Sequence, residues 1–324
     1  MYKVYDRWPE IAATSHSSQN DLIDFKGIDH IIFAGMGGSG TICDVFSSIL
    51  SKTKLHVCVI KGYLLPKTVD SNTLVVTTSV SGDTAETLTV LDSATKLDCK
   101  IIAFSSDGKM QQYCAKNKIE HRNIPQFHSP RASLTSFLYS MLKVLQPMIP
   151  VTQEDIKESV SLLEKTQKEI SSSNLTDKNP SLRLAEWISS STLIYHPWGL
   201  QAVAIRFKNS LQENAKLHAM AEDAVEASHN GIVSWERRSD VKPVLITGED
   251  DYIKTKERWQ IIKKYFEENK IDYKEIHSVK GSILSKLINL IYLLDYATIY
   301  KALLDGIDPS PIRSIDFIKK YLND

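Results

Sequence analysis

The sequence predicts an α/β protein made of two halves, each a parallel sheet flanked by helices. The chain has 324 residues, about twice the roughly 150 residues of an ordinary domain. Short apolar runs alternate with longer amphipathic segments, which is typical of buried parallel strands joined by helices. A strand, a glycine-containing loop and a helix open each half, at 30–51 and at 191–215. This repetition indicates a duplication of topology.

The first half contains four predicted strands. The run at 30–34 leads into Gly35-Met36-Gly37-Gly38-Ser39-Gly40 and a predicted helix over 41–51. A helix is also expected over 85–96, where Asp83 and Glu86 resemble a capping box at its start. The other predicted elements are strands over 55–60, 73–79 and 100–105 and an amphipathic helix over 132–146.

Two prolines between 146 and 152 mark a predicted domain boundary, which gives domains of 1–148 and 149–324. The polar stretch 171–180 is expected to be a loop. In the second half we expect strands over 191–195 and 241–246, and helices over 200–215, 257–270, 284–304 and 315–322.

Composition excludes several classes of partner. Lys plus Arg and Asp plus Glu number 39 each, so no global positive field favours nucleic acid or an anionic membrane, and we expect neither. The apolar run 287–294 is far shorter than a membrane span, and the first residues lack the apolar core of a signal peptide. The four cysteines have no metal-like spacing, which predicts reduced thiols and a cytoplasmic protein.

Two loops have the composition of phosphate sites. Glycines at 37, 38 and 40 surround Ser39, and Ser79, Ser81 and Thr84 surround Gly82 just before a predicted helix. Backbone N–H groups at a helix start bind anions without any net charge on the protein, and hydroxyls add neutral donors. Glycines after strands and Ser or Thr at helix starts are also ordinary turns and caps. For each loop by itself, a phosphate site and a purely structural turn are therefore equal alternatives.

A nicotinamide-dependent dehydrogenase is a weaker alternative. Gly35, Gly37 and Gly40 match the Gly-x-Gly-x-x-Gly pattern of dinucleotide binding. The next strand, however, ends in Val59-Ile60-Lys61-Gly62, without the acidic residue that would bind a ribose. No cofactor is therefore expected. No grouping of His, Cys, Asp or Glu has the spacing of metal ligands either, which disfavours a zinc-dependent sugar isomerase.

Five segments in this order resemble the bifunctional phosphoglucose/phosphomannose isomerases, the archaeal-type branch of the SIS sugar-isomerase proteins. They are FAGMGGSG at 33–40, TSVSGDTAETL at 78–88, SPR at 129–131, QENAK at 212–216 and SHN at 228–230. The similarity continues through GIDPSP at 306–311 and IDFIK at 315–319. Three positions depart from the pattern: Gly231 stands where an acidic residue is expected, and Gln212 and Asp83 stand where asparagine is usual.

The resemblance implies two Rossmann-like SIS subdomains of the flavodoxin type, a homodimer, and a role in glycolysis and gluconeogenesis. It implies that Ser39, Ser79, Ser81 and Thr84 contact the phosphate of a hexose 6-phosphate, with Gly37 and Gly38 in the substrate loop. Glu213 would move a proton between C1 and C2, and Arg131 would stabilise the enediolate. His229, from the partner subunit, and Lys319 or its neighbour Lys320 would assist ring opening.

The chemistry of these side chains fits the implied roles. A partly buried carboxylate can remove a proton next to a carbonyl, and an arginine stays protonated beside an oxyanion. Position alone would make Glu213 a surface partner of Lys208 or Lys216. Ring opening suits a histidine, the residue type that can exchange a proton at physiological pH; His229 is the candidate, and its rivals are His196 and His218. Other open alternatives are a different aldose–ketose isomerase, an amidosugar-phosphate enzyme and a non-catalytic sugar-phosphate sensor.

Overall fold

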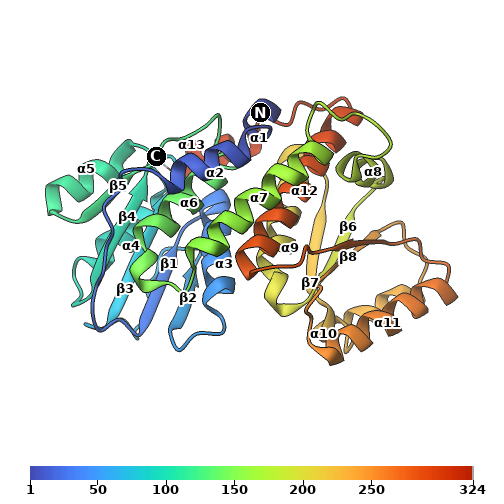
Figure 1. Cartoon of the computed structure of the whole chain (residues 1–324), viewed down its shortest axis with the longest axis horizontal. Helices are drawn as coiled ribbons and strands as arrows, with labels where there is room; N and C mark the ends of the chain where they lie inside the picture. Colours follow the sequence, from blue (N-terminus) through green and yellow to red (C-terminus); the bar gives the residue numbers. More distant parts are fainter. Residues whose placement is uncertain (323–324) are drawn as a thin grey trace.

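The computed structural model describes residues 1–322 and contains two parallel sheets, each flanked by helices (Figure 1). In the first sheet the strands follow the order β2-β1-β3-β4-β5, and every neighbouring pair is parallel. This is the flavodoxin-type order, so the predicted fold class is confirmed. The strands are β1 (His30–Ala34), β2 (His56–Ile60), β3 (Thr73–Ser79), β4 (Lys100–Ser105) and β5 (Glu120–Asn123).

The second sheet repeats this order without a fifth strand. Its strands follow the order β7-β6-β8-β9 and are again all parallel. The first strand of each half therefore lies between the second and the third, which confirms the duplicated topology. The strands are β6 (Thr192–His196), β7 (Ala219–Asp223), β8 (Lys242–Thr247) and β9 (Lys274–His277).

Helices cover both faces of the two sheets (Figure 1). In the first half they are α1 (Tyr2–Tyr5), α2 (Trp8–His16), α3 (Gly37–Leu50), α4 (Ala85–Ala94), α5 (Gly108–Asn117), α6 (Leu134–Val144) and the 3₁₀ turn η1 (Gln146–Met148). The second half has α7 (Gln153–Ile170), α8 (Pro180–Trp187), η2 (Trp198–Leu200), α9 (Gln201–Ser210), the π turn η3 (Leu211–Ala215), α10 (Ala224–Ala227), η4 (Gly231–Glu236), α11 (Ile253–Glu268), α12 (Ile283–Leu304) and α13 (Arg313–Leu322).

The glycine-rich segment after β1 differs from its expected structure. The sequence predicts a helix start at Thr41, but α3 begins at Gly37, so the glycines form its first turn. The helix predicted over 85–96 does begin at Ala85, but without the expected capping box. The carboxylate of Asp83 instead accepts a hydrogen bond from the backbone N–H of Lys109, at 2.9 Å.

Helix α12 is the central element of the core. It is long and apolar enough to cross a membrane by length and composition, which the run 287–294 alone did not indicate, but 83% of its apolar window is buried inside the fold. It packs against α7, α8 and α9. Helix α9 also packs on α3 of the first half, and one apolar cluster continues from β1 and α3 through α9 to α12. Packing therefore fixes α9 of the second half against α3 of the first.

The predicted boundary at 148/149 lies between η1 and α7. Helix α7 contacts α2 of the first half as well as α12 and α8 of the second. The shared core means that the two sheets are held together by buried apolar contacts in addition to the linker. The boundary itself remains a prediction.

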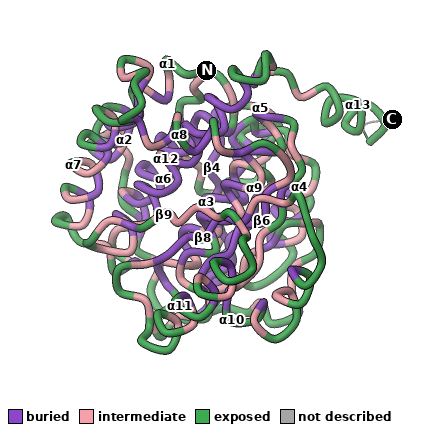
Figure 2. Tube along the Cα trace, turned by 90° about the vertical axis from the view of Figure 1, so that its right-hand side faces the viewer, coloured by how far each residue is buried: buried purple, intermediate pink, exposed green. Residues whose placement is uncertain are grey.

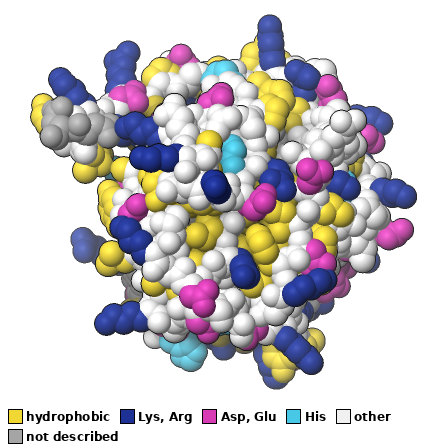
Figure 3. Space-filling model, turned by 90° about the vertical axis from the view of Figure 1, so that its left-hand side faces the viewer, with side chains coloured by type: hydrophobic (Ala, Val, Ile, Leu, Met, Phe, Trp, Pro, Cys, Tyr) yellow, Lys and Arg dark blue, Asp and Glu magenta, His cyan; other side chains and the backbone are white. Residues whose placement is uncertain are grey.

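The surface carries interspersed charges. Lys and Arg side chains alternate with Asp and Glu on the face seen in Figure 3, in keeping with a formal net charge of zero. Helix α13 projects from the body of the protein (Figure 2) and has no buried residue. Several of its large apolar side chains, among them Phe317, Ile318 and Tyr321, are more than half exposed.

Candidate active site

Two loops converge at the point in the first sheet where the strand order reverses, between β1 and β3. In open α/β sheets, ligands bind at the carboxyl ends of the strands next to such a reversal. The backbone N–H of Val80 donates to Oγ of Ser39 at 3.2 Å and ties the two loops together. A β-carbon on Gly35 would lie 3.0 Å from the carbonyl oxygen of Thr78, so a larger residue there would push the two loops apart.

Three of the four predicted phosphate hydroxyls lie where these two loops meet. Oγ of Ser79 lies 2.9 Å from Oγ1 of Thr84, and it accepts the N–H of Gly82 at 3.0 Å. Ser39 is buried in the first turn of α3, next to the same loop. Ser81 is exposed, and its hydroxyl accepts the N–H of Asp83. Hydroxyls and two helix starts therefore meet in one place, as anion binding requires.

Arg131 and Glu213 form an ion pair that joins the two halves. Nη1 of Arg131 donates to Oε2 of Glu213 at 2.8 Å; the arginine side chain is 5% exposed and the glutamate 27%. Nη2 donates to the carbonyl oxygens of Pro309 and Ser310, at 2.6 and 3.0 Å. The buried Nε has no hydrogen-bond partner among the described residues. A buried donor without an acceptor is costly, so it suits an incoming oxyanion.

A cavity of about 860 Å³ contains Glu213 and extends to the glycine loop at Gly37. Gly38 also approaches the Arg131 segment: a β-carbon there would lie 3.2 Å from the carbonyl oxygen of Pro130. The loop therefore lies between these hydroxyls and the ion pair. The other lining residues are Asn209, Gln212, Lys216, Asp308, Pro311, Ile312, Arg313, Ser314 and Ile315.

The two lysines close to Glu213 in the sequence bind other groups and not its carboxylate. Lys208 contacts the side chain of Gln212, at 3.4 Å. The amine of Lys216 donates to the main-chain carbonyl of Glu213 and, at 2.7 Å, to that of Pro311. Burial, followed by the nearby Arg131 guanidinium, lowers the pKa of Lys216. The simple surface ion pair considered from the sequence is therefore absent from the described structure.

Of the predicted site residues, Gly37 and Glu213 line this cavity, and Arg131 is joined to it through its ion pair with Glu213. His229 and Lys319 lie outside the lining and have no such link in the described chain. His229 follows α10 and is exposed, and Lys319 is exposed on α13. The ammonium of the neighbouring Lys320 lies 5.9 Å from the ring centre of Tyr321. Of the rival histidines, His218 is exposed, whereas His196 is buried, and burial lowers its pKa.

Gly231 leaves room for a carboxylate. A β-carbon at this position would lie 2.4 Å from Oε2 of Glu222, a buried atom without a hydrogen-bond partner in the described chain. Gly231 therefore leaves space for the side chain of Glu222, which places an acidic group beside the His229 segment.

Sequence reasoning missed the buried polar residues behind the site. Arg206 and Asp295 lie 2.6 Å apart and are 3% and 0% exposed. Each is an ionisable side chain within an otherwise buried helical segment, and this contrast is the signal that could have identified them. The lining segment 308–315 carried no signal of its own beyond the family resemblance.

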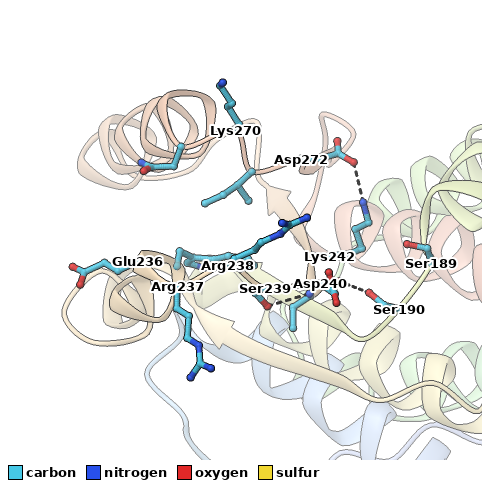
Figure 4. Close-up of a pocket in the computed structure, with 14 residues that line it drawn as sticks. Ser189, Ser190, Glu236, Arg237, Arg238, Ser239, Asp240, Lys242, Lys270 and Asp272 are labelled. Carbon is cyan, nitrogen blue, oxygen red and sulfur yellow. Dashed lines mark hydrogen bonds and ion pairs between the residues drawn. The ribbon is translucent and has the colours of Figure 1, made fainter.

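A second cavity, of about 810 Å³, lies apart from these residues in the second half (Figure 4). It is lined by the segments that precede β6, β8 and β9, so it is at the amino edge of the second sheet. Lys242 is already paired there with Asp272, at 3.0 Å. Ligands of parallel α/β sheets bind at the opposite edge, and we assign no site to this cavity.

Among residues 1–322, no group of three or more His, Cys, Asp or Glu side chains is placed to hold a metal ion.

Two family models match the chain. The SIS domain matches residues 25–145, and the bacterial phospho-glucose isomerase C-terminal SIS domain matches residues 177–322. The first match contains the two loops and Arg131, and the second contains Glu213.

Curated relatives align over nearly the full length. A bifunctional phosphoglucose/phosphomannose isomerase from Caldicellulosiruptor bescii is 31% identical over 98% of this chain and 97% of its own. One of the same name from Aquifex aeolicus is 30% identical over 99% and 98%. Among solved structures, a hypothetical protein from Thermus thermophilus shares the fold with a TM-score of 0.76 at 13% identity, covering 98% of this chain and 89% of that one.

We predict that Gly82→Ala disrupts the hydroxyl loop. Gly82 has φ +74°, and a β-carbon there would lie 1.7 Å from the carbonyl oxygen of Asp107. The substitution should therefore lower the free energy of unfolding by about 2 to 4 kcal/mol. Gly62→Ala is the control, because a β-carbon at Gly62 meets no atom within 4 Å. Equal unfolding midpoints for the two variants would contradict the prediction.

Proposed function

The chain belongs to the bifunctional phosphoglucose/phosphomannose isomerase family, and we propose that it interconverts glucose 6-phosphate and mannose 6-phosphate with fructose 6-phosphate through a cis-enediol, without a metal ion. It is an enzyme, an isomerase. The observation that carries the proposal is the Arg131–Glu213 ion pair, whose glutamate lines one cavity together with Gly37 of the glycine loop.

The loops after β1 and β3 bind the phosphate in this proposal. Ser39, Ser79 and Thr84 donate hydroxyls, Ser81 donates from the rim, and the first turns of α3 and α4 supply N–H groups. Gly37 and Gly38 allow the sugar to pass close to the backbone. Binding the phosphate between these loops directs C1 and C2 toward Arg131 and Glu213.

Glu213 acts as the base. It removes the proton from C1 of fructose 6-phosphate, which leaves an enediolate, and returns the proton to C2 to give an aldose. The carboxylate already accepts a hydrogen bond from Arg131, at 2.8 Å, which orients it toward the cavity. Both C2 epimers form if the enediol can rotate about the C2–C3 bond before the proton returns.

Arg131 stabilises the enediolate oxygens. Its guanidinium is fixed by the carbonyls of Pro309 and Ser310, so it is preorganised for charge that develops during the reaction. Its Nε offers a further donor for which the described chain provides no acceptor.

His229 opens the sugar ring from the partner subunit of a homodimer, and Lys319 assists. The support for a dimer is the exposed apolar side chains in the segments that follow β6 and β7, the second of which contains His229: Trp198 is 74% exposed, Val233 57% and Val225 38%. Contiguous exposed apolar patches mark interfaces, and in this proposal these side chains form one between the two subunits. The exposed position of His229, away from the Glu213 cavity of its own chain, fits a contribution to the neighbouring site.

The enzyme acts, in this proposal, on hexose 6-phosphates in the central metabolism of the cell. Hexose 6-phosphates are its substrates, and the reaction places it in the glycolysis and gluconeogenesis of the cytoplasm. We divide the chain into an N-terminal SIS subdomain, 1–148, and a C-terminal SIS subdomain, 149–324.

The proposed reaction is tested by proton NMR of fructose 6-phosphate in D2O with EDTA-treated protein. We expect glucose 6-phosphate and mannose 6-phosphate, both carrying deuterium at C2, because the proton held by Glu213 exchanges with solvent before it returns. In Glu213→Gln, turnover should fall about 10²- to 10⁴-fold while the unfolding midpoint is preserved.

Unchanged fructose 6-phosphate would contradict a metal-free isomerase. Wild-type activity in Glu213→Gln would contradict the assignment of the base. Glucose 6-phosphate as the sole product would retain the mechanism and remove the second substrate.

Mixing two inactive variants tests the shared site. If His229 acts in the partner's site, Glu213→Gln and His229→Ala subunits combine into heterodimers with one intact site. Random exchange of equal amounts should then restore about a quarter of the wild-type activity. A mixture that stays as inactive as its components after subunit exchange would place His229 in the site of its own chain.

A further inference from the structure

A buried carboxylate on α12 accepts hydrogen bonds from three side chains around the candidate active site. Asp295 is 0% exposed. Its oxygens accept from Nη2 of Arg206 at 2.6 Å, from Oγ of Ser210 at 2.7 Å and from the hydroxyl of Tyr5 at 3.1 Å. These donors come from α9 and from α1, so one carboxylate connects the N-terminal helix of the chain with helix α9 of the second half.

The first connection leads to Arg131. The same Nη2 of Arg206 that donates to Asp295 also donates to the carbonyl oxygen of Arg131, at 2.7 Å. Arg206 is thus fixed from one side by Asp295, and it fixes the main chain from which the Arg131 side chain reaches Glu213.

The second connection leads to Glu213. Ser210 immediately precedes the π turn η3 that carries Glu213, and its hydroxyl is anchored on Asp295. Near the other end of the turn, Nδ2 of Asn214 donates to Oγ1 of Thr298 at 2.8 Å, and that hydroxyl donates to the carbonyl of Asp295 at 2.7 Å. Both ends of the Glu213 turn are therefore attached to one turn of α12.

Stability alone is a weak reason for this arrangement. Two charges taken out of water lose their hydration, and apolar residues of similar size often replace a buried ion pair without loss of stability. The groups tied to Asp295 are instead the main chain of Arg131 and the turn of Glu213, whose separation has to match the reacting carbons.

We propose that Asp295 and Arg206 are positioning residues of the isomerase, which set the guanidinium of Arg131 and the carboxylate of Glu213 relative to each other. The inference rests on the proposed function. Neither residue lines the cavity, and neither contacts substrate. Their contribution is to the geometry of proton transfer and enediolate stabilisation, while the phosphate loops remain unchanged.

The test replaces the whole pair, because Asp295→Asn alone would leave the charge of Arg206 buried without a partner. In the double variant Arg206→Met/Asp295→Leu we expect kcat to fall about 10- to 100-fold, with KM within about threefold of wild type. Lys263→Met/Glu275→Leu is the control: it removes a partly buried ion pair away from the cavity, between α11 and β9, and should keep wild-type kcat.

A binding measurement separates positioning from loss of structure. 5-Phosphoarabinonate carries a carboxylate where the enediolate forms, whereas sorbitol 6-phosphate offers only the phosphate and hydroxyls. We expect the double variant to lose affinity for the first by about tenfold or more and to bind the second like wild type. A merely structural role would weaken both ligands equally or neither.

A folded double variant with wild-type kcat and wild-type affinity for 5-phosphoarabinonate would overturn the inference. If the double variant does not fold, Ser210→Ala is measured in the same two assays. It removes one anchor of the Glu213 turn and leaves the ion pair intact, so wild-type kcat and wild-type affinity for 5-phosphoarabinonate would again overturn the inference. A wild-type protein inactive on fructose 6-phosphate would contradict the proposed function as well, whereas an active wild type with an equally active variant would contradict this inference alone.

Discussion

The ion pair between Arg131 and Glu213 is the constraint on which the site depends. The two residues are 82 positions apart in the sequence and come from different halves, and their side chains meet at 2.8 Å. A pair of this kind forms at that distance only if α9 is seated correctly on α3 and α12. The shared apolar core provides this seating, so the assembly of the site follows from the packing of the two halves.

In the proposed function, the phosphate is recognised by a local group of hydroxyls and backbone N–H groups. With equal numbers of acidic and basic residues, the chain has no long-range field to attract a sugar phosphate. Binding would instead depend on the reversal of strand order between β1 and β3, which brings two helix starts and several hydroxyls together. The close approach of Gly35 to Thr78, and of Gly38 to Pro130, then joins this group of hydroxyls to the Arg131 segment.

The sequence predicted the buried parts of the fold well and the edges poorly. Apolar strands such as β1 and β3 have a clear signature, and both were placed correctly. The three strands that were missed, β5, β7 and β9, all lie at the edge of a sheet. Segments such as Glu120–Asn123 carry polar side chains toward solvent, so neither hydrophobic runs nor alternation reveals them. Similarly, nothing in the charged sequence of α7 indicates that this helix contacts both halves.

For the candidate site, sequence motifs pointed to the candidate residues, but the structure was needed to show which of them contact each other. The hydroxyl loops could be recognised because each is contiguous in sequence. The partner of Glu213 could not, since the nearby Lys208 and Lys216 were the local choices and Arg131 is remote. The account is tested most directly by a crystal structure of the protein with 5-phosphoarabinonate. It predicts the phosphate on Ser39, Ser79 and Thr84, and the carboxylate in contact with Arg131 beside Glu213. A ligand bound in the cavity at the amino edge of the second sheet, or with its carboxylate away from Arg131, would contradict it.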